Sequence, residues 1–278
     1  MLTDMSLLVP NIDEMKQVNS FIKSIDKKIE VNNQINDNLE KMAQAIFKQW
    51  FIDFEFPNED GEPYKSSNGE MIESELGMIP KEWELGCIGD YVKVKSGFAF
   101  KSAWWQENGI PVIKIKDISN NTINFNDISY VSEDKIDSAK DFIVNAGDLV
   151  IAMTGATIGK FAIVPPRKSN VLVNQRVGKF FLGENPLNRL GFIYCLLCRE
   201  EVYNQIVSRG DGSAQPNISP SNIESIKIIL PRDEVIIKFN NLVTSIFEKI
   251  IRNVEECNKL TDLRDILLPK LMSGEIRV

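Results

Sequence analysis

The sequence of 278 residues contains no histidine. This absence excludes Ser-His-Asp and Cys-His nucleophile arrangements and every metal site with an imidazole ligand. The chain also lacks a long apolar run, because the longest, such as residues 149–153, fall far short of the roughly 20 residues of a membrane-spanning helix. The N-terminus has no basic segment followed by an apolar one. We therefore expect a cytoplasmic protein that does not contact a membrane.

Cysteine is also scarce. Four residues, Cys87, Cys195, Cys198 and Cys257, are too few and too scattered for a disulfide framework, so we expect reduced thiols. Cys195 and Cys198 form a CxxC pair, but this pair lies in the apolar helical stretch 192–198 and has no second pair of ligands. Packing inside a helix is therefore favoured over a zinc or redox site.

Positive charge is in deficit, since the net charge is −7. The acidity lies at the front: residues 1–76 carry 7 basic and 15 acidic side chains, residues 77–230 carry 17 and 16, and residues 231–278 carry 8 of each. Neutralising phosphates supplies most non-specific affinity for nucleic acids. A monomer with this balance is therefore expected to bind DNA weakly unless a partner helps.

The first segment of the chain returns near the end, shifted by 221 residues and without a gap. Matching pairs are Pro10 and Pro231, Ile22 and Val243, Ile25 and Ile246, Lys28 and Lys249, Ile29 and Ile250, Asn32 and Asn253, Leu39 and Leu260, and Ile46 and Leu267. Two copies this far apart enclose a separate domain rather than forming a solenoid. The predicted order is helix, globular domain, helix.

Both copies carry apolar residues at alternating steps of four and three, the spacing of a coiled-coil seam. The seam can pack within one domain, against the other copy in this chain, or against a second chain, and the two matched copies favour mutual pairing. Asn32 and Asn253 occupy equivalent seam positions, and we interpret them as setting the register. The predicted interface residues are Ile22, Ile25, Ile29, Asn32, Leu39, Ile46, Val243, Ile246, Ile250, Asn253, Leu260 and Leu267.

Between the two predicted helices the residue composition changes. Residues 57–75 are rich in Gly, Pro, Ser, Asn and acidic side chains, which is typical of a linker. Short apolar runs separated by turn residues then predict strands at 91–94, 112–115, 149–153, 161–164, 171–173, 177–182 and 226–230, with a helix over 187–208. The predicted fold class is α+β: a helical region at 1–56, a linker at 57–76, a mixed, mostly-β domain at 77–230 and a helical region at 231–278.

The stretch from Gly155 to Lys160 is similar to a phosphate-binding loop. That motif, however, has four residues between its glycines and a Ser or Thr after the lysine, whereas here three residues separate the glycines and Phe161 follows the lysine. It lies between two predicted strands, so a glycine-dependent turn is the better interpretation. Asn185-Pro186-Leu187 does not match the loop of an amino-methyltransferase. We expect no catalysis by this chain and no bound metal.

Lys114 and Lys116 alternate with apolar residues, so in a strand both would point to one face. Arg, Lys, Asn and Gln side chains read base edges and hold phosphates. For any one residue a solvated surface role is the alternative, but together the set favours DNA. The candidates are Lys101, Trp104, Trp105, Lys114, Lys116, Thr154, Lys160, Gln175, Arg176, Arg209, Gln215 and Asn217.

Several stretches together resemble the DNA specificity subunits of type I restriction-modification systems. They are LEKMAQAIFKQWF at 39–51, LGMIPKEW at 76–83, GDLVIAMTGATIGK at 147–160, VNQRV at 173–177, GSAQPNIS at 212–219 and LRDILLPKLMSGEI at 263–276. The resemblance covers nearly the whole chain. It implies that the middle domain is a target recognition domain for one half of a bipartite double-stranded DNA target, and that the helices form an antiparallel spacer on which methyltransferase subunits dock.

The resemblance also implies partners. S-adenosylmethionine would be bound by the methyltransferase subunits, ATP and Mg²⁺ by a restriction and translocation subunit, and neither by this chain. Typical members carry two recognition domains, so one domain between two helices resembles a half-length form that self-associates head to tail and reads a split palindrome. The alternatives are a regulatory scaffold that binds methyltransferase subunits without reading DNA, and, more remotely, a free-standing enzyme.

Overall fold

A computed structural model describes residues 12–210, 216–273 and 275–276. The chain divides into two compact units: unit 1 holds the described residues up to 39 and from 252 onward, and unit 2 holds residues 40–251. Two long helices, α1 (Ile12–Phe51) and α7 (Asp233–Met272), contribute to both units. These are the two helices that the sequence repeat predicts. Pro10, the first member of that repeat, lies outside the described residues.

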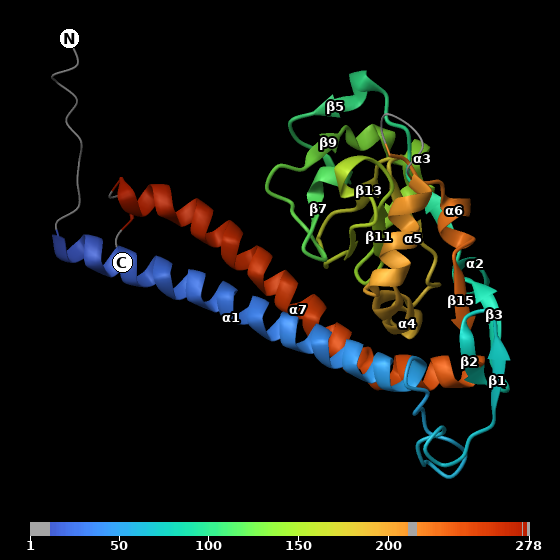
Figure 1. The fold of residues 1–278 in the computed structure, drawn as a ribbon. Helices are drawn as coiled ribbons and strands as arrows, with labels where there is room; N and C mark the ends of the chain where they lie inside the picture. The colour runs from blue at the N-terminus through green and yellow to red at the C-terminus, as the bar shows by residue number, and fades with distance from the viewer. Residues whose placement is uncertain (1–11, 211–215, 274, 277–278) are drawn as a thin grey trace. The chain divides into compact units, whose positions relative to one another are not determined.

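In unit 1, α1 and α7 lie side by side and antiparallel (Figure 1). The Asn253 side chain donates a hydrogen bond to Asn36 Oδ1 at 2.8 Å, and Arg264 pairs with Asp26 at 2.9 Å. The chain therefore pairs its own two helices, which is the alternative that the sequence favours. All twelve predicted interface residues, in both units, are buried or half-buried.

The repeat relates positions within the seam of unit 1. It carries residue 32 to 253 and residue 36 to 257, so a strict two-fold relation would exchange the contact between Asn36 and Asn253 with one between Asn32 and Cys257. The Asn32 side chain instead donates to Glu256 Oε2 at 2.9 Å, and Cys257 Sγ contacts the Ile29 carbonyl and Asn33 Oδ1 at 3.8 Å. Asn32 and Asn253 thus belong to adjacent layers of the seam rather than facing each other.

Unit 2 is built around two sheets. The first has the order β10 (Ile143–Val144), β13 (Val171–Val173), β6 (Ile110–Ile113), β9 (Ser129–Val131) and β5 (Trp105–Gln106); the second has the order β12 (Phe161–Ile163), β11 (Leu149–Ala152), β14 (Val177–Phe180) and β4 (Val94–Ser96). Only β13 and β6 pair in parallel; the other pairs of these two sheets are antiparallel. Strands β6, β11, β12 and β13 are continuous apolar runs, and the two sheets share a core that includes Ile113 and Val150, both 0% exposed.

Three two-stranded antiparallel pairs accompany the sheets: β15 (Lys227–Leu230) with β3 (Glu84–Cys87), β7 (Ile118–Ser119) with β8 (Thr122–Ile123), and β1 (Met71–Ser74) with β2 (Gly77–Pro80). Strand β1 falls within the segment whose composition predicts a linker. Before it, the Phe56 ring stacks on both Tyr64 and Trp83, so local aromatic contacts order part of that segment. The domain limits drawn from the sequence remain a prediction.

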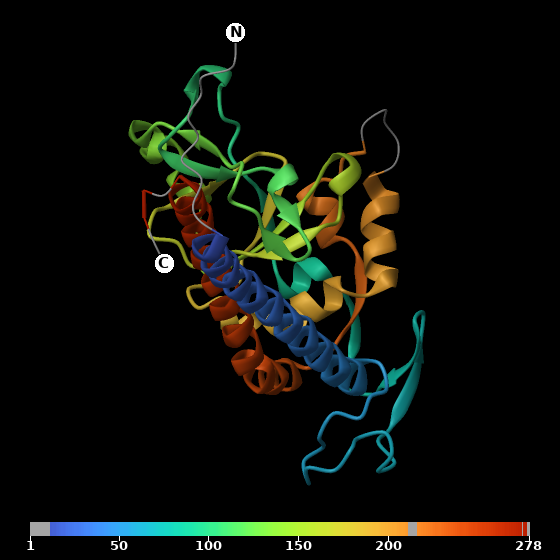
Figure 2. The ribbon, with the colours of Figure 1, turned by 90° about the vertical axis from the view of Figure 1, so that its left-hand side faces the viewer.

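Short helices complete unit 2. They are α2 (Ile88–Tyr91), α3 (Ile136–Ala139), α4 (Leu187–Leu197), α5 (Glu200–Gly210), α6 (Pro220–Glu224) and the 3₁₀ turns η1 (Ser102–Trp104), η2 (Ile115–Asp117), η3 (Glu133–Lys135), η4 (Lys140–Phe142) and η5 (Gly155–Thr157). The helix predicted over 187–208 is split at Cys198 and Arg199, and α5 lies at one edge of the unit (Figure 2). The strand predicted at 91–94 is wrong. Tyr91 ends α2 and donates a hydrogen bond to the Arg189 carbonyl at 2.7 Å.

An aromatic cluster joins both long helices to α4 inside unit 2. The Phe51 ring, 4% exposed, contacts Phe47, Trp50, Trp83, Phe192 and Phe239 at centroid distances of 4.9 to 6.3 Å. Rings at such distances add edge-to-face attraction to the burial of apolar area. Among the described residues, no helix is long and apolar enough to cross a membrane.

Candidate nucleic-acid interface

The predicted strand at 112–115 is wrong at its end, and Lys114 and Lys116 are placed accordingly. Strand β6 stops at Ile113, because the Asp117 carboxylate accepts the Lys114 backbone N–H at 2.8 Å and turns the chain into η2. Lys116 Nζ donates to Asp117 Oδ1 at 2.7 Å and to the Asp127 carbonyl at 2.5 Å. Lys116 therefore neutralises a buried carboxylate and adds no free charge to a surface.

Lys114 remains at the end of β6 with a different role from its neighbour. Its Nζ donates to Ser129 Oγ at 2.8 Å and lies 3.5 Å from the centroid of the Trp105 ring. Burial lowers the pKa of this ammonium group, and the nearby Asp117 carboxylate acts in the opposite direction. The Trp105 face and the Ser129 hydroxyl thus hold Lys114 in one position.

Parallel pairing brings a second segment to the same place. Val173 of β13 is in register with Ile113 of β6, and the Asn174 N–H donates to the Ile113 carbonyl at 2.9 Å. Because parallel strands end at the same edge of a sheet, Gln175 and Arg176 emerge next to Lys114. Both are exposed, and the Arg176 guanidinium has no hydrogen-bond or ion-pair partner among the described residues.

The end of β11 joins this edge from the second sheet. The Met153 N–H donates to the Arg176 carbonyl at 2.9 Å, and Thr154 forms an isolated bridge with Asn217. The chain then turns at Gly155, whose φ of 71° lies in the left-handed region that glycine adopts readily. The predicted turn between two strands is therefore confirmed. Thr154 Oγ1 is buried without a hydrogen-bond partner.

Three of the candidates are placed otherwise. The Arg209 guanidinium donates to the Asn222 carbonyl at 2.8 Å and to Ser225 Oγ at 2.7 Å, so it ties α5 to α6. Lys160 is exposed on the far arm of the β11–β12 hairpin, where it lines a pocket. Gln215 lies outside the described residues.

Aromatic rings and lysines extend the edge beyond the strand ends. Trp104 stacks on Phe98 at 5.9 Å, and Lys101 and Lys135 lie 5.7 and 5.6 Å from the Trp104 ring. Lys95 lies 4.8 Å from the Phe142 ring. Sequence reasoning missed Lys95 and Lys135, and their distance from the aromatic run in sequence gave no signal. We call the exposed or half-buried residues gathered here the strand-end surface; it comprises Lys95, Lys101, Trp104, Trp105, Lys114, Lys135, Thr154, Gln175, Arg176 and Asn217.

No group of three or more Cys, Asp or Glu suited to a metal ion occurs among the described residues. Burial and the neighbouring Glu40 carboxylate raise the pKa of the Cys198 thiol to about 12, and burial raises that of Cys195 well above its usual range. Both thiols are therefore protonated at neutral pH, and neither has the thiolate character of a reactive cysteine.

The geometry defines an architecture: a two-sheet domain with a basic, aromatic edge is inserted in the sequence between two helices that pair with each other. Residues 80–262 match the family model described as "Type I restriction modification DNA specificity domain". The chain belongs to this family, as the sequence resemblance predicts.

Relatives agree with this assignment, and a solved structure shares the fold. The chain is 30% identical over 281 residues to the type I restriction enzyme MjaIX specificity subunit of Methanocaldococcus jannaschii, covering 100% of this chain and 62% of that protein. It is 27% identical over 329 residues to the HindI specificity subunit of Haemophilus influenzae, covering 99% and 70%. The fold is similar to that of the type I restriction-modification S subunit from M. genitalium, with a TM-score of 0.52, 17% identity, and coverage of 94% and 61%. The chain thus spans about three fifths of the length of the MjaIX subunit and of that S subunit.

Proposed function

We propose that this chain is the DNA-reading subunit of a type I restriction-modification complex and that its strand-end surface contacts one half of a bipartite target. The observation that carries the proposal is the convergence of Lys114, Gln175 and Arg176 at one edge, where β6 and β13 end side by side. Donors on side chains held by strand ends are well suited to base edges and phosphates.

The charges of this chain support a division of DNA binding between this chain and its partner subunits. The Arg176 guanidinium is unpaired among the described residues, whereas Lys116 and Arg209 are occupied by intramolecular contacts. Residues 77–230 carry only one more basic than acidic side chain. With so small an excess of positive charge in residues 77–230, partner subunits would supply much of the affinity for phosphates. No catalytic step is assigned to this chain.

The paired helices support a scaffold role. One recognition domain and one pair of repeated helices would account for half of a symmetric reader. Two such chains, associated head to tail, would present two identical strand-end surfaces at a fixed separation. The target of such a dimer is a split palindrome, and the helices provide the docking surface for methyltransferase subunits.

Light scattering on the full chain, alone and with methyltransferase subunits of the same system, tests the assembly. We expect a mass that corresponds to two copies of this chain in the complex, and selection from random duplexes should return a palindromic split sequence. A stable complex that selects no sequence would instead support the regulatory scaffold. Failure to bind methyltransferase subunits at all would contradict both.

A matched pair of substitutions tests the surface. Arg176→Gln should weaken binding of the reconstituted complex to its selected target about tenfold or more, measured by fluorescence anisotropy across a salt series. Lys168→Gln is the control, because Lys168 lies between β12 and β13, at the opposite end of these strands from Arg176. Equal affinities for the two variants would remove the strand-end surface from the proposal.

A further inference from the structure

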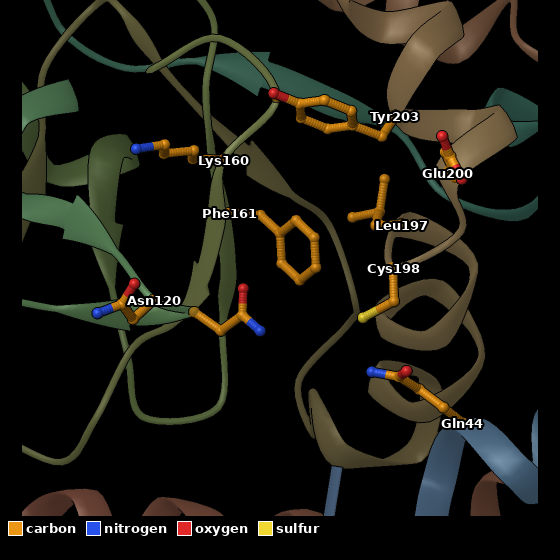
Figure 3. Close-up of a pocket in the computed structure, with 10 residues that line it drawn as sticks. Gln44, Asn120, Lys160, Phe161, Leu197, Cys198, Glu200 and Tyr203 are labelled. Atoms are coloured by element: carbon orange, nitrogen blue, oxygen red, sulfur yellow. The ribbon is translucent and has the colours of Figure 1, made fainter. Parts of the chain in front are cut away.

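A pocket of about 480 Å³ lies in unit 2 beside the β11–β12 hairpin (Figure 3). Its lining residues come from four segments: the last turns of α1 (Gln44), the tip of the β7–β8 hairpin (Asn120, Asn121), the start of β12 (Gly159, Lys160, Phe161) and the junction of α4 with α5 (Leu197, Cys198, Glu200, Tyr203). This volume falls within the range of small-molecule sites. Neither the family assignment nor the strand-end surface accounts for it.

The apolar part of the pocket is built around rings. Phe161 is 7% exposed and packs edge-on against the Tyr194 ring at 5.3 Å. The Tyr203 ring lies directly over Gly159, since a Cβ built there would come within 2.9 Å of Tyr203 Cε2. In Figure 3 the Tyr203 and Phe161 rings border the same space. The absence of a side chain at Gly159 thus allows an aromatic wall.

The polar part combines carboxamides with two opposite charges. Gln44, Asn120 and Asn121 offer amide donors and acceptors, and Asn121 Nδ2 donates to Glu40 Oε2 at 3.0 Å, which fixes that side of the hairpin tip. Lys160 and Glu200 stand apart in Figure 3, and neither has a hydrogen-bond or ion-pair partner among the described residues. An unpaired cation and an unpaired anion at separate places suit a ligand with one anionic end and one donor end.

From this arrangement we infer that the pocket binds a nucleotide whose base carries an exocyclic amino group, adenine or cytosine, with its phosphate toward Lys160. Glu200 would accept a hydrogen bond from the amino group, as acidic side chains do from cytosine N4, and the Asn and Gln amides suit the remaining base edge. Stacking on an aromatic wall is the usual way in which proteins hold an unpaired base. Lys160 pairs with phosphate as a point charge.

Calorimetric titration of the full chain with AMP, CMP, UMP and inorganic phosphate tests the ligand class. AMP and CMP should bind at least about tenfold more tightly than UMP, because UMP presents a carbonyl oxygen where CMP presents the amino group. Glu200→Gln should abolish this preference, and Tyr203→Ala should weaken AMP binding about fivefold or more. Glu184→Gln, a change at an exposed acid elsewhere in unit 2, should alter neither.

Each variant must keep the thermal midpoint of the parent chain before its affinity is interpreted. Absence of AMP and CMP binding, or equal binding of all three nucleotides that Glu200→Gln leaves unchanged, would overturn the inference. The nucleotide titration does not depend on the DNA-reading role. Failure of the nucleotide inference therefore leaves the proposed function intact, and failure of the proposed function leaves the nucleotide inference intact.

A second arm separates two sources of the same nucleotide chemistry: a free nucleotide, and an unpaired base of bound DNA. The probe is a duplex with an unpaired adenine next to a 2-aminopurine, added to the full chain and then challenged with AMP. A rise in 2-aminopurine fluorescence as the adenine leaves its stack, reversed by AMP, would assign the pocket to a base of DNA. AMP binding that leaves the duplex fluorescence unchanged would assign it to the free nucleotide.

Discussion

The two units of this chain use the same pair of helices in opposite ways. In unit 1 the helices meet through buried amides: Asn32, Asn36 and Asn253 are only 1%, 7% and 1% exposed. In unit 2 the same helices meet through rings, where Phe47 and Phe51 of α1 pack against Phe239 of α7. One repeat thus contributes a hydrogen-bonded seam at one end and an aromatic core at the other.

This contrast shows what each end is suited to do. Ring packing removes a large apolar area from water, so it contributes most of the stability at that end. Amides in a seam contribute little net stability, but they penalise every register in which they lose their partners. Unit 2 therefore anchors the helices, whereas unit 1 sets how they are aligned.

The aromatic cluster should be the more sensitive to truncation. Phe51→Ala removes a ring that contacts five others, and we expect a loss of about 3–5 kcal/mol in the free energy of unfolding. Denaturant unfolding followed by tryptophan fluorescence measures it. The control is Phe181→Ala, at a phenylalanine that is 42% exposed, where we expect a loss of less than about 1 kcal/mol. Similar losses would show that Phe51 is no anchor.

The buried Cys198 thiol allows a second test of the stability of unit 2, based on pH. Because burial raises the pKa of Cys198 from 9.0 to about 12, the folded chain holds this proton more tightly than the unfolded chain does. Its contribution to stability is complete below pH 9 and is lost as the pH rises toward 12. We expect the free energy of unfolding to fall between pH 9 and 11 by about 2 kcal/mol more in the parent chain than in Cys198→Ala. If the free energy of unfolding falls equally with pH in the parent chain and in Cys198→Ala, the buried Cys198 thiol is not the source of the effect.

The amide seam of unit 1 should respond differently to single and double changes. Asn253→Ala leaves Asn36 Oδ1 buried without its donor, and we expect a loss of about 1–2 kcal/mol in local stability. Replacing Asn36 and Asn253 together by Leu should restore stability, because two apolar residues suit a seam, while register control is lost. Amide hydrogen exchange in unit 1 measures the local stability of the single and the double variant. Asn19→Ala, at an exposed position of α1, is the control. A double variant weaker than the single one would refute this account.

The helices, most of the core strands and the glycine turn at 155 are predictable from the sequence, because each depends on local periodicity or backbone freedom. The position of Lys116 is not, since Asp117 ends strand β6 through hydrogen bonds to Lys114 and Lys116 that no alternation pattern encodes. The sequence also suggests one helix at 187–208, but Cys198 and Arg199 interrupt it.

The strand-end surface is only partly predictable for a related reason. Residue types identify Lys114, Gln175 and Arg176 as candidates, but only the parallel pairing of β13 with β6 brings them together, and strand pairing over 60 residues leaves no trace in local spacing. Arg209 has the same chemistry as Arg176, yet a neighbouring carbonyl and hydroxyl occupy it. Whether an arginine side chain is available to bind DNA therefore depends on the fold and not on the residue type.

Ion pairs give the smallest difference between the units. In unit 1, Arg264 and Asp26 are 30% and 51% exposed, whereas in unit 2 Lys179 and Asp148 are 16% and 4% exposed and 2.6 Å apart. Water and salt screen the exposed pair, so Asp26→Asn should cost less than about 1 kcal/mol in the free energy of unfolding, and the loss should vanish near 1 M salt. Denaturant unfolding at low and high salt checks this. A larger or salt-independent loss would mean that this ion pair, rather than the amides, aligns the helices of unit 1.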